Sequence, residues 1–100
     1  MSVSQLSYEI SLLNTAKVRF LSIINQLNNA ALALEPIGGR ISSLYTIDEN
    51  STPISFRSTN LRINLINLAN DISANVLTSI DYQIFNKQQQ LNIEQANGNY

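Results

Sequence analysis

Cysteine, histidine and tryptophan are all absent from this sequence of 100 residues. Without cysteine the chain has no disulfide framework and no thiolate metal site. Without histidine it lacks the usual general base near neutral pH and the commonest metal ligand. The carboxylates are scattered and form no catalytic pair. We therefore predict that the protein is not an enzyme, and that it has no catalytic residue, no metal and no cofactor.

Charge is also scarce. Charged residues make up 13% of the chain, with six basic and seven acidic residues and a net charge of −1, against about 25% in an average domain. Nucleic-acid binding needs clustered cations that neutralise phosphates, and these cations are spread along the chain, so we predict no nucleic-acid partner. A surface with little charge is poorly protected against association, and a protein partner is therefore expected.

Long hydrophobic runs are missing. The longest uncharged stretch, residues 20–34, contains several Asn and Gln residues and is shorter than the about 20 apolar residues of a membrane span. The N-terminus has no basic segment followed by an apolar core, as a cleavable signal peptide would. We predict no membrane span and a cytoplasmic location before assembly. Secretion by a route without such a signal, or incorporation in a particle, remains open.

What the sequence does have is a long heptad pattern. Between residues 3 and 34, apolar residues recur at alternating steps of three and four, and Lys17 is the only break. Such a repeat predicts one long amphipathic helix that packs along another helix. Ser2 and Gln5 match a capping box at its start, and Pro36 predicts its end at Glu35. The pattern consists of Val3, Leu6, Ile10, Leu13, Lys17, Phe20, Ile24, Leu27, Ala31 and Leu34.

A second helix is predicted over residues 53–95, after a connection at 36–52 in which Gly38 and Gly39 allow a tight reversal. Thr52 and Pro53 match a helix start, and a later start at Ser58 or Thr59 is the alternative. Its apolar residues follow heptad spacing and then steps of four, which relaxes the supercoil locally. They are Leu61, Leu65, Leu68, Ile72, Val76, Ile80 and Ile84. We expect fraying after Phe85 and a disordered tail at residues 96–100.

Together these elements predict a single all-α domain, a long antiparallel helical hairpin. The first helix carries a second apolar face with Leu12, Ala16, Ile23 and Ala30, and one partner helix does not cover it. We therefore expect the hairpin to complete a four-helix bundle or coiled coil on association. The predicted interaction residues are Leu6, Ile10, Leu13, Lys17, Phe20, Ile24, Leu27, Leu12, Ile23, Leu65, Leu68, Ile72, Val76, Ile80, Tyr82 and Phe85.

Lys17 has two interpretations. Its long side chain can lie along the apolar surface and keep its ammonium group in water, or it can pair with a carboxylate and fix partner choice. For such a pair we consider Glu9, Asp71 and Asp81, and favour Asp71 because of its expected depth along the hairpin. Two aromatic residues near the expected fraying point, Tyr82 and Phe85, form either a docking patch or part of the core.

Two long helices joined by a glycine-bearing turn, with no cysteine and a polar C-terminal tail, resemble the WXG100 (ESAT-6-like) proteins of type VII secretion and the small helical partners of LXG toxins. Residues 37–39 are Ile-Gly-Gly where the WXG100 motif has Trp-x-Gly, and Tyr82 is followed four residues later by Asn86 instead of an acidic residue. The LXG partners are therefore the closer comparison. The neutral composition also resembles subunits of axial filaments and small phage structural proteins.

The expected function is association without catalysis. The first hypothesis is a secretion partner or adaptor that pairs with itself or with the helical domain of a larger effector. The alternative is a repeating structural subunit of a filament or phage particle.

Overall fold

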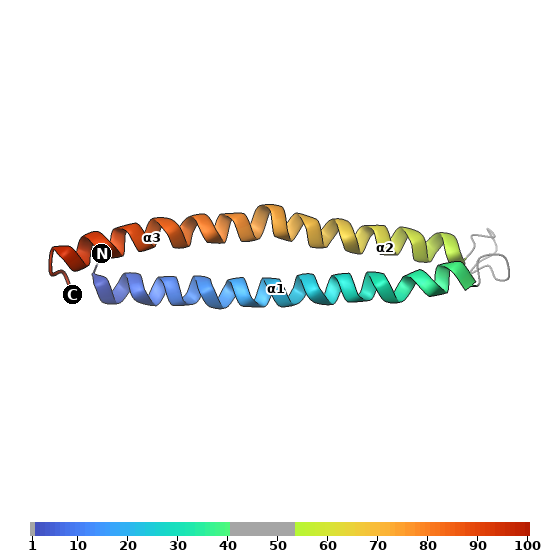
Figure 1. Ribbon diagram of the computed structural model, residues 1–100, viewed down its shortest axis with the longest axis horizontal. Coiled ribbons are helices and arrows are strands. Elements are labelled where there is room, and N and C mark those ends of the chain that lie inside the picture. The colour runs from blue at the N-terminus through green and yellow to red at the C-terminus, as the bar shows by residue number, and fades with distance from the viewer. Residues whose placement is uncertain (1, 41–53) are drawn as a thin grey trace. The chain divides into compact units, whose positions relative to one another are not determined.

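The structure of the protein is a computed structural model that describes residues 2–40 and 54–100, with only the backbone described at 35–40 and 54–57. Within this part of the chain there are helices and no strands, so the predicted all-α helical hairpin is confirmed (Figure 1). The elements are α1 (Val3–Arg40), α2 (Ile54–Asp71), the π-helix η1 (Ile72–Leu77) and α3 (Thr78–Ala96).

The chain divides into two compact units. Unit 1 consists of Met1–Ser22 and Ile72–Tyr100, and unit 2 of Ile23–Asp71. Figure 1 shows the N-terminal part of α1 antiparallel to α3 within unit 1, and the later part of α1 antiparallel to α2 within unit 2. Three contacts in unit 1 show that the pairing is antiparallel: Val3 with Asn99, Glu9 with Lys87, and Lys17 with Asp81. Along these contacts the residue number rises in the N-terminal segment and falls in the C-terminal segment.

The predicted heptad pattern of α1 is buried or half-buried at every position from Val3 to Leu34, including Lys17. We call these residues the first seam. The helix starts as predicted: the Ser2 hydroxyl oxygen accepts a hydrogen bond from the Gln5 backbone N–H at 3.1 Å, which satisfies one of the free amides of the first turn. The second half of the predicted capping box does not form: the Gln5 side-chain amide donates to the Glu9 carboxylate at 3.4 Å, and the Gln5 side chain does not reach back to the cap.

The end of α1 differs from the prediction. The helix continues to Arg40 instead of stopping at Glu35, and it includes Gly38 and Gly39, so these glycines do not form the expected reversal. Pro36 lacks an N–H and removes one hydrogen bond, to the Leu32 carbonyl, from a helix that is already long. The cost of that single bond does not end the helix.

The second predicted helix corresponds to α2, η1 and α3. Since α2 is helical from Ile54, the alternative start at Ser58 or Thr59 is wrong. The expected cap at Thr52 and Pro53, and the predicted turn residues at 41–51, lie outside the described residues.

The residues that this second helix buries are not all those predicted. Leu61 and Leu68 are 51% and 49% exposed, whereas Arg62 is half-buried and Ala69 is 2% exposed. Leu65 and Ile72 are in the seam as predicted, but the positions that alternate with them lie one residue later, because large leucines beside the contact line gave a stronger signal than the small or polar residues in it. Ile66 is also half-buried and lies beside the contact line; we call the other buried and half-buried residues the second seam: Ser58, Arg62, Leu65, Ala69, Ile72, Val76, Leu77, Ile80, Ile84, Lys87, Leu91 and Glu94.

The second seam contains two heptad series that are offset by one residue. Steps of three and four connect Ser58 to Val76, and a new series of the same steps starts at Leu77 and ends at Glu94. The junction lies inside η1, where the backbone forms a π-helix. A π-turn bonds residue i to i+5 and accommodates one extra residue per turn. The four-residue steps through Val76 and Ile80, from which we expected a relaxed supercoil, coincide in the structure with a π-helical insertion.

The C-terminal residues are ordered by hydrogen bonds, so the predicted disorder of residues 96–100 is wrong. The Gly98 N–H donates to the Gln95 carbonyl at 3.2 Å and the Asn99 N–H to the Glu94 carbonyl at 3.0 Å. With Gly98 at φ +74°, this is a Schellman motif, in which glycine takes the left-handed conformation just after the helix. The Asn99 carbonyl then accepts from the Val3 N–H at 2.9 Å, which joins the two ends of unit 1.

Candidate interaction surface

Unit 1 has a small core that closes its own end. Val3, Leu6 and Leu91 form a buried cluster, and Ile10 packs against it. Leu6 is the most buried of them, with 1% of its surface exposed. Full burial of one such side chain stabilises the fold by about 1.5–3 kcal/mol. This cluster lies next to the hydrogen bond from Val3 to Asn99, so apolar packing and the backbone contact hold the same pair of chain ends together.

One side of the unit 1 seams is closed by an ion pair between Glu9 and Lys87. The Lys87 Nζ atom lies 2.9 Å from Glu9 Oε2, and both side chains are mostly buried. The hydrogen bond from Lys87 lowers the pKa of Glu9, partial burial opposes this shift, and the hydrogen bond from Gln5 adds to the lowering. The carboxylate therefore stabilises the folded state in its ionised form. Sequence reasoning missed this pair because Lys87 lies beyond the strongly patterned part of the chain.

Lys17 pairs with Asp81, not with the favoured Asp71. The Lys17 Nζ atom lies 2.7 Å from Asp81 Oδ1, and the two side chains are 37% and 54% exposed. Lys17 thus keeps its charge at the edge of the seam, as the first interpretation predicted, and also has a carboxylate partner. Asp71 belongs to unit 2. The register of the antiparallel pair, which the sequence did not provide, decides between the two aspartates.

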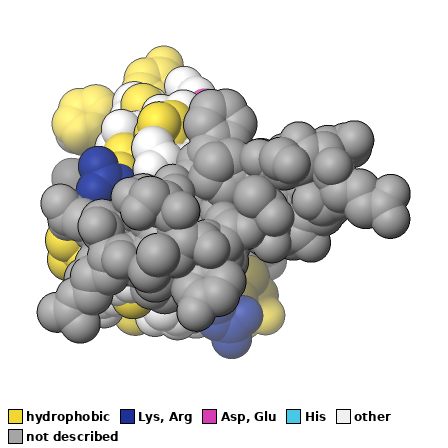
Figure 2. Space-filling view, turned by 90° about the vertical axis from the view of Figure 1, so that its right-hand side faces the viewer, with side chains coloured by type: hydrophobic (Ala, Val, Ile, Leu, Met, Phe, Trp, Pro, Cys, Tyr) yellow, Lys and Arg dark blue, Asp and Glu magenta, His cyan; other side chains and the backbone are white. Residues whose placement is uncertain are grey.

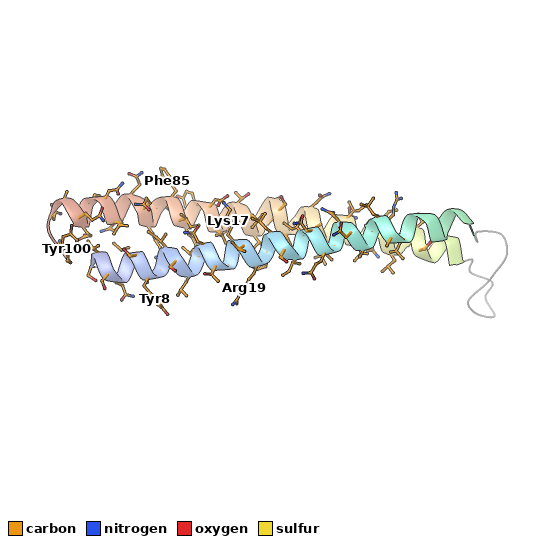
Figure 3. The ribbon with its side chains drawn as sticks, turned by 60° about the horizontal axis from the view of Figure 1, so that its bottom comes forward. Tyr8, Lys17, Arg19, Phe85 and Tyr100 are labelled. Carbon is orange, nitrogen blue, oxygen red and sulfur yellow. The ribbon has the colours of Figure 1, made fainter. Side chains whose placement is uncertain are left out.

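Large apolar side chains project from the outer surface of unit 1. Tyr82 and Phe85 on α3 are 67% and 61% exposed, and Tyr8 and Leu12 on α1 are also exposed. Figure 3 shows Tyr8 and Phe85 pointing away from the helix pair, each from its own helix. The interpretation of Tyr82 and Phe85 as core residues is therefore wrong for this chain. The three-residue spacing places both on one outer face of α3. We call Tyr82 and Phe85 the aromatic patch.

Unit 2 has a groove on one side of its seams. It is lined by Asn28, Ala31 and Leu32 of α1 and by Arg62 and Ile66 of α2, and its volume is about 420 Å³. Ala31 and Arg62 belong to the seams. The other three residues each directly follow a seam residue in the sequence, which places them on the same side of the helix pair.

The opposite side of unit 2 carries exposed apolar residues among the polar residues Gln26, Asn64 and Asp71. Ile23, Ala30, Leu61 and Leu68 each directly precede a seam residue, so they lie on the side away from the groove. Ile23 is 40% exposed, and Leu61 and Leu68 are about half exposed. We call these four residues the apolar flank. None of them carries charge, and in the end-on view of Figure 2 hydrophobic side chains reach the surface on several sides of the described residues.

The predicted interaction residues thus fall into three groups. One group lies in the seams and is covered by the chain itself: Leu6, Ile10, Leu13, Lys17, Phe20, Ile24, Leu27, Leu65, Ile72, Val76 and Ile80. A second group is exposed on the two units and comprises Leu12, Ile23, Tyr82 and Phe85. The third group is Leu68 alone, which was predicted in the seam and lies in the apolar flank. Leu61 also lies in the apolar flank but was not among the predicted interaction residues.

No helix in the described part of the chain combines the length and apolar character needed to cross a membrane. Among the same residues, no three His, Cys, Asp or Glu side chains are grouped so that they would hold a metal ion. No protein-family model, curated protein or solved structure matches this chain.

Proposed function

We propose that the protein is a non-enzymatic helical assembly protein that completes a helical bundle with another helical polypeptide. The partner is a second copy of the chain or the helical domain of a larger protein. The apolar flank of unit 2 is the observation that carries this proposal. It presents leucine and isoleucine at helical spacing, directly beside seams that already pack helix against helix, and a further helix extends that packing.

Charged side chains accompany the seams of both units. In unit 1, the Glu9–Lys87 and Lys17–Asp81 ion pairs border the seams. In unit 2, Arg62 is a seam residue and Asp71 directly precedes one, and this unit also presents the uncharged apolar flank. A partner surface that fits this flank is itself apolar and uncharged, with residues spaced by three and four along a helix. We therefore assign partner binding to unit 2 and closure of the chain ends to unit 1.

The resemblance to type VII secretion proteins narrows the proposal. For a small partner of an LXG toxin, the occupant of the apolar flank is the helical N-terminal region of the toxin. Co-expression with such a region tests this: the supporting result is a soluble complex of fixed stoichiometry that the L61Q/L68Q variant fails to form. A complex that forms equally well with the variant contradicts the assignment of the flank.

The second candidate function is a repeating subunit of a filament or particle. The aromatic patch on unit 1 favours it, because a chain with two separate apolar surfaces can bind one neighbour through each. Contacts between unlike surfaces that do not close into a ring produce open polymers.

Light scattering over an about hundredfold range of concentration, alone and with candidate partners, separates these functions. A discrete dimer or heterocomplex that is lost in L61Q/L68Q and retained in Y82Q/F85Q supports the first. Growth into open polymers that Y82Q/F85Q also prevents supports the second. The two double variants are matched, since each replaces two exposed apolar side chains by glutamine, a good helix former. A compact monomer at every dilution and with every partner contradicts both.

A further inference from the structure

The C-terminal cap contains the chain's only asparagine that is followed by glycine, Asn97-Gly98. The Asn97 side chain is exposed to solvent. A Cβ atom added at Gly98 would meet no other atom within 4 Å, so the approach to this peptide bond is open. Since glycine has no side chain, its backbone nitrogen is the least hindered nucleophile that can follow an asparagine.

We propose that Asn97 is a site of spontaneous deamidation, and that opening of the C-terminal cap controls its rate. The backbone nitrogen of Gly98 loses its proton and attacks the side-chain carbonyl carbon Cγ of Asn97. A C–N bond forms, the bond from Cγ to the side-chain nitrogen breaks, and ammonia leaves. Water then opens the resulting succinimide at one of its two carbonyl carbons, giving aspartate or isoaspartate at position 97. No oxidant, reductant or enzyme takes part.

The closed cap opposes this attack in two ways. The Gly98 N–H, whose proton must leave, donates a hydrogen bond to the Gln95 carbonyl at 3.2 Å. Asn97 is held at φ −87° and ψ −4°, with its own N–H bonded to the Ile93 carbonyl. The reaction needs rotation about ψ to bring the Gly98 nitrogen to Cγ, and that rotation breaks the Schellman motif. The reactive conformation is therefore one in which the cap has opened.

The two products affect the cap differently. Isoaspartate inserts one extra methylene group into the main chain, which moves the donors of Gly98 and Asn99 away from the Gln95 and Glu94 carbonyls. Either product also places a negative charge at the C-terminus of α3, where the helix dipole disfavours it. Isoaspartate thus breaks the hydrogen bond between the Asn99 carbonyl and the Val3 N–H irreversibly, and aspartate weakens the cap. This inference does not depend on the proposed function.

The test is a time course of the whole protein at mildly alkaline pH, native and unfolded in urea, followed by peptide mapping with isoaspartate detection. We expect Asn97 to react before every other asparagine, and severalfold faster in urea than in the native protein. The N99A variant removes the hydrogen bond from the Asn99 side chain to Glu94, at 2.6 Å, and should react faster than wild type in the native state. Q88A is the matched control, because it removes an exposed hydrogen bond to Asn92 elsewhere on α3 and should leave the rate unchanged.

A second control is N97Q, because glutamine keeps the amide but forms the corresponding ring much more slowly. Its native spectrum should match that of wild type, and no product should form at position 97. After ageing, hydrogen exchange at the Val3 and Gly98 amides should accelerate in wild type but not in N97Q. If Asn97 deamidates at the same rate in native wild type and in wild type unfolded in urea, the cap does not control the reaction, and that part of the proposal is overturned. Reaction of other asparagines first, or no reaction at Asn97 in the native protein, overturns the site.

Discussion

The offset inside η1 makes a sharp prediction about deletions. Deleting Ala74, an exposed residue of η1, should join the two heptad series of the second seam into one. Leu77 then takes the seam position four residues after Ile72, and the series continues through Ile80 without a break. Val76, which is only half-buried, leaves the seam, and we expect a change in stability within about 1 kcal/mol.

Deleting Gln83, which is also exposed, should have a very different effect. An α-helix turns by about 100° per residue, so the deletion rotates every later residue of α3 away from the seam. Leu91 loses its burial at about 1.5–3 kcal/mol, half-buried Ile84 loses about half as much, and Lys87 is turned away from Glu9. The sum is a large share of the about 5–15 kcal/mol that stabilises a small protein.

Circular dichroism during heating and urea titration measures both variants. The Ala74 deletion should keep the helix content and melt within a few degrees of wild type. The Gln83 deletion should lower the melting temperature by about 20 °C or abolish cooperative melting, since 1 kcal/mol corresponds to roughly 4–8 °C in a domain of this size. Equal destabilisation by the two deletions would refute our interpretation of η1 as a one-residue insertion.

Three further predictions concern substitutions of Lys17, of Glu9 together with Glu94, and of Leu6. Replacing Lys17 by leucine should raise the melting temperature by a few degrees, because added burial outweighs an exposed ion pair worth about 0.5 kcal/mol; a change in oligomer size would instead give Lys17 a role in specificity. Hydrogen bonds, chiefly from Lys87 to Glu9 and from Asn99 to Glu94, lower the pKa values of these two carboxyl groups from the ordinary glutamate value. This stabilisation is complete above the unfolded pKa and is lost as the pH falls through the folded pKa values. In the double variant with glutamine at both positions, the free energy of unfolding from urea titrations should therefore depend less on pH below about 4.3, the ordinary pKa of glutamate. Replacing Leu6 by alanine should cost about 2–5 kcal/mol, whereas the same change at exposed Leu12 should cost less than about 0.5 kcal/mol.

The first seam could be predicted residue by residue because nearly all of its members are large and apolar, so the pattern and the burial coincide. The second seam could not. Ser58, Arg62 and Ala69 give little or no hydrophobic signal, although they are buried or half-buried, and the neighbouring leucines suggested a contact line one residue away. The four-residue steps after Ile72 were visible in the sequence, but a relaxed supercoil and a π-helix produce the same spacing. Only the backbone distinguishes these alternatives.

The predictions for the ion pairs and for the C-terminus were wrong for different reasons. The choice between Asp71 and Asp81 depends on the register of two antiparallel helices, that is, on which residue of the second helix lies opposite Lys17. The sequence pattern did not provide that register. The ordered C-terminus had a local signal in Asn97-Gly98, since glycine just after a helix is typical of a Schellman motif. That signal was outweighed by the polar composition of the preceding residues.

The joining of the two ends of unit 1 has a mechanical consequence. A force that pulls residues 2 and 100 apart acts first on the hydrogen bond between Val3 and Asn99, and then on the Leu6–Leu91 cluster and the Glu9–Lys87 pair in turn. The helices of this unit are peeled apart one layer at a time instead of sliding past each other with all contacts loaded together. Unit 1 should therefore open at low force, by unzipping from the chain ends inward.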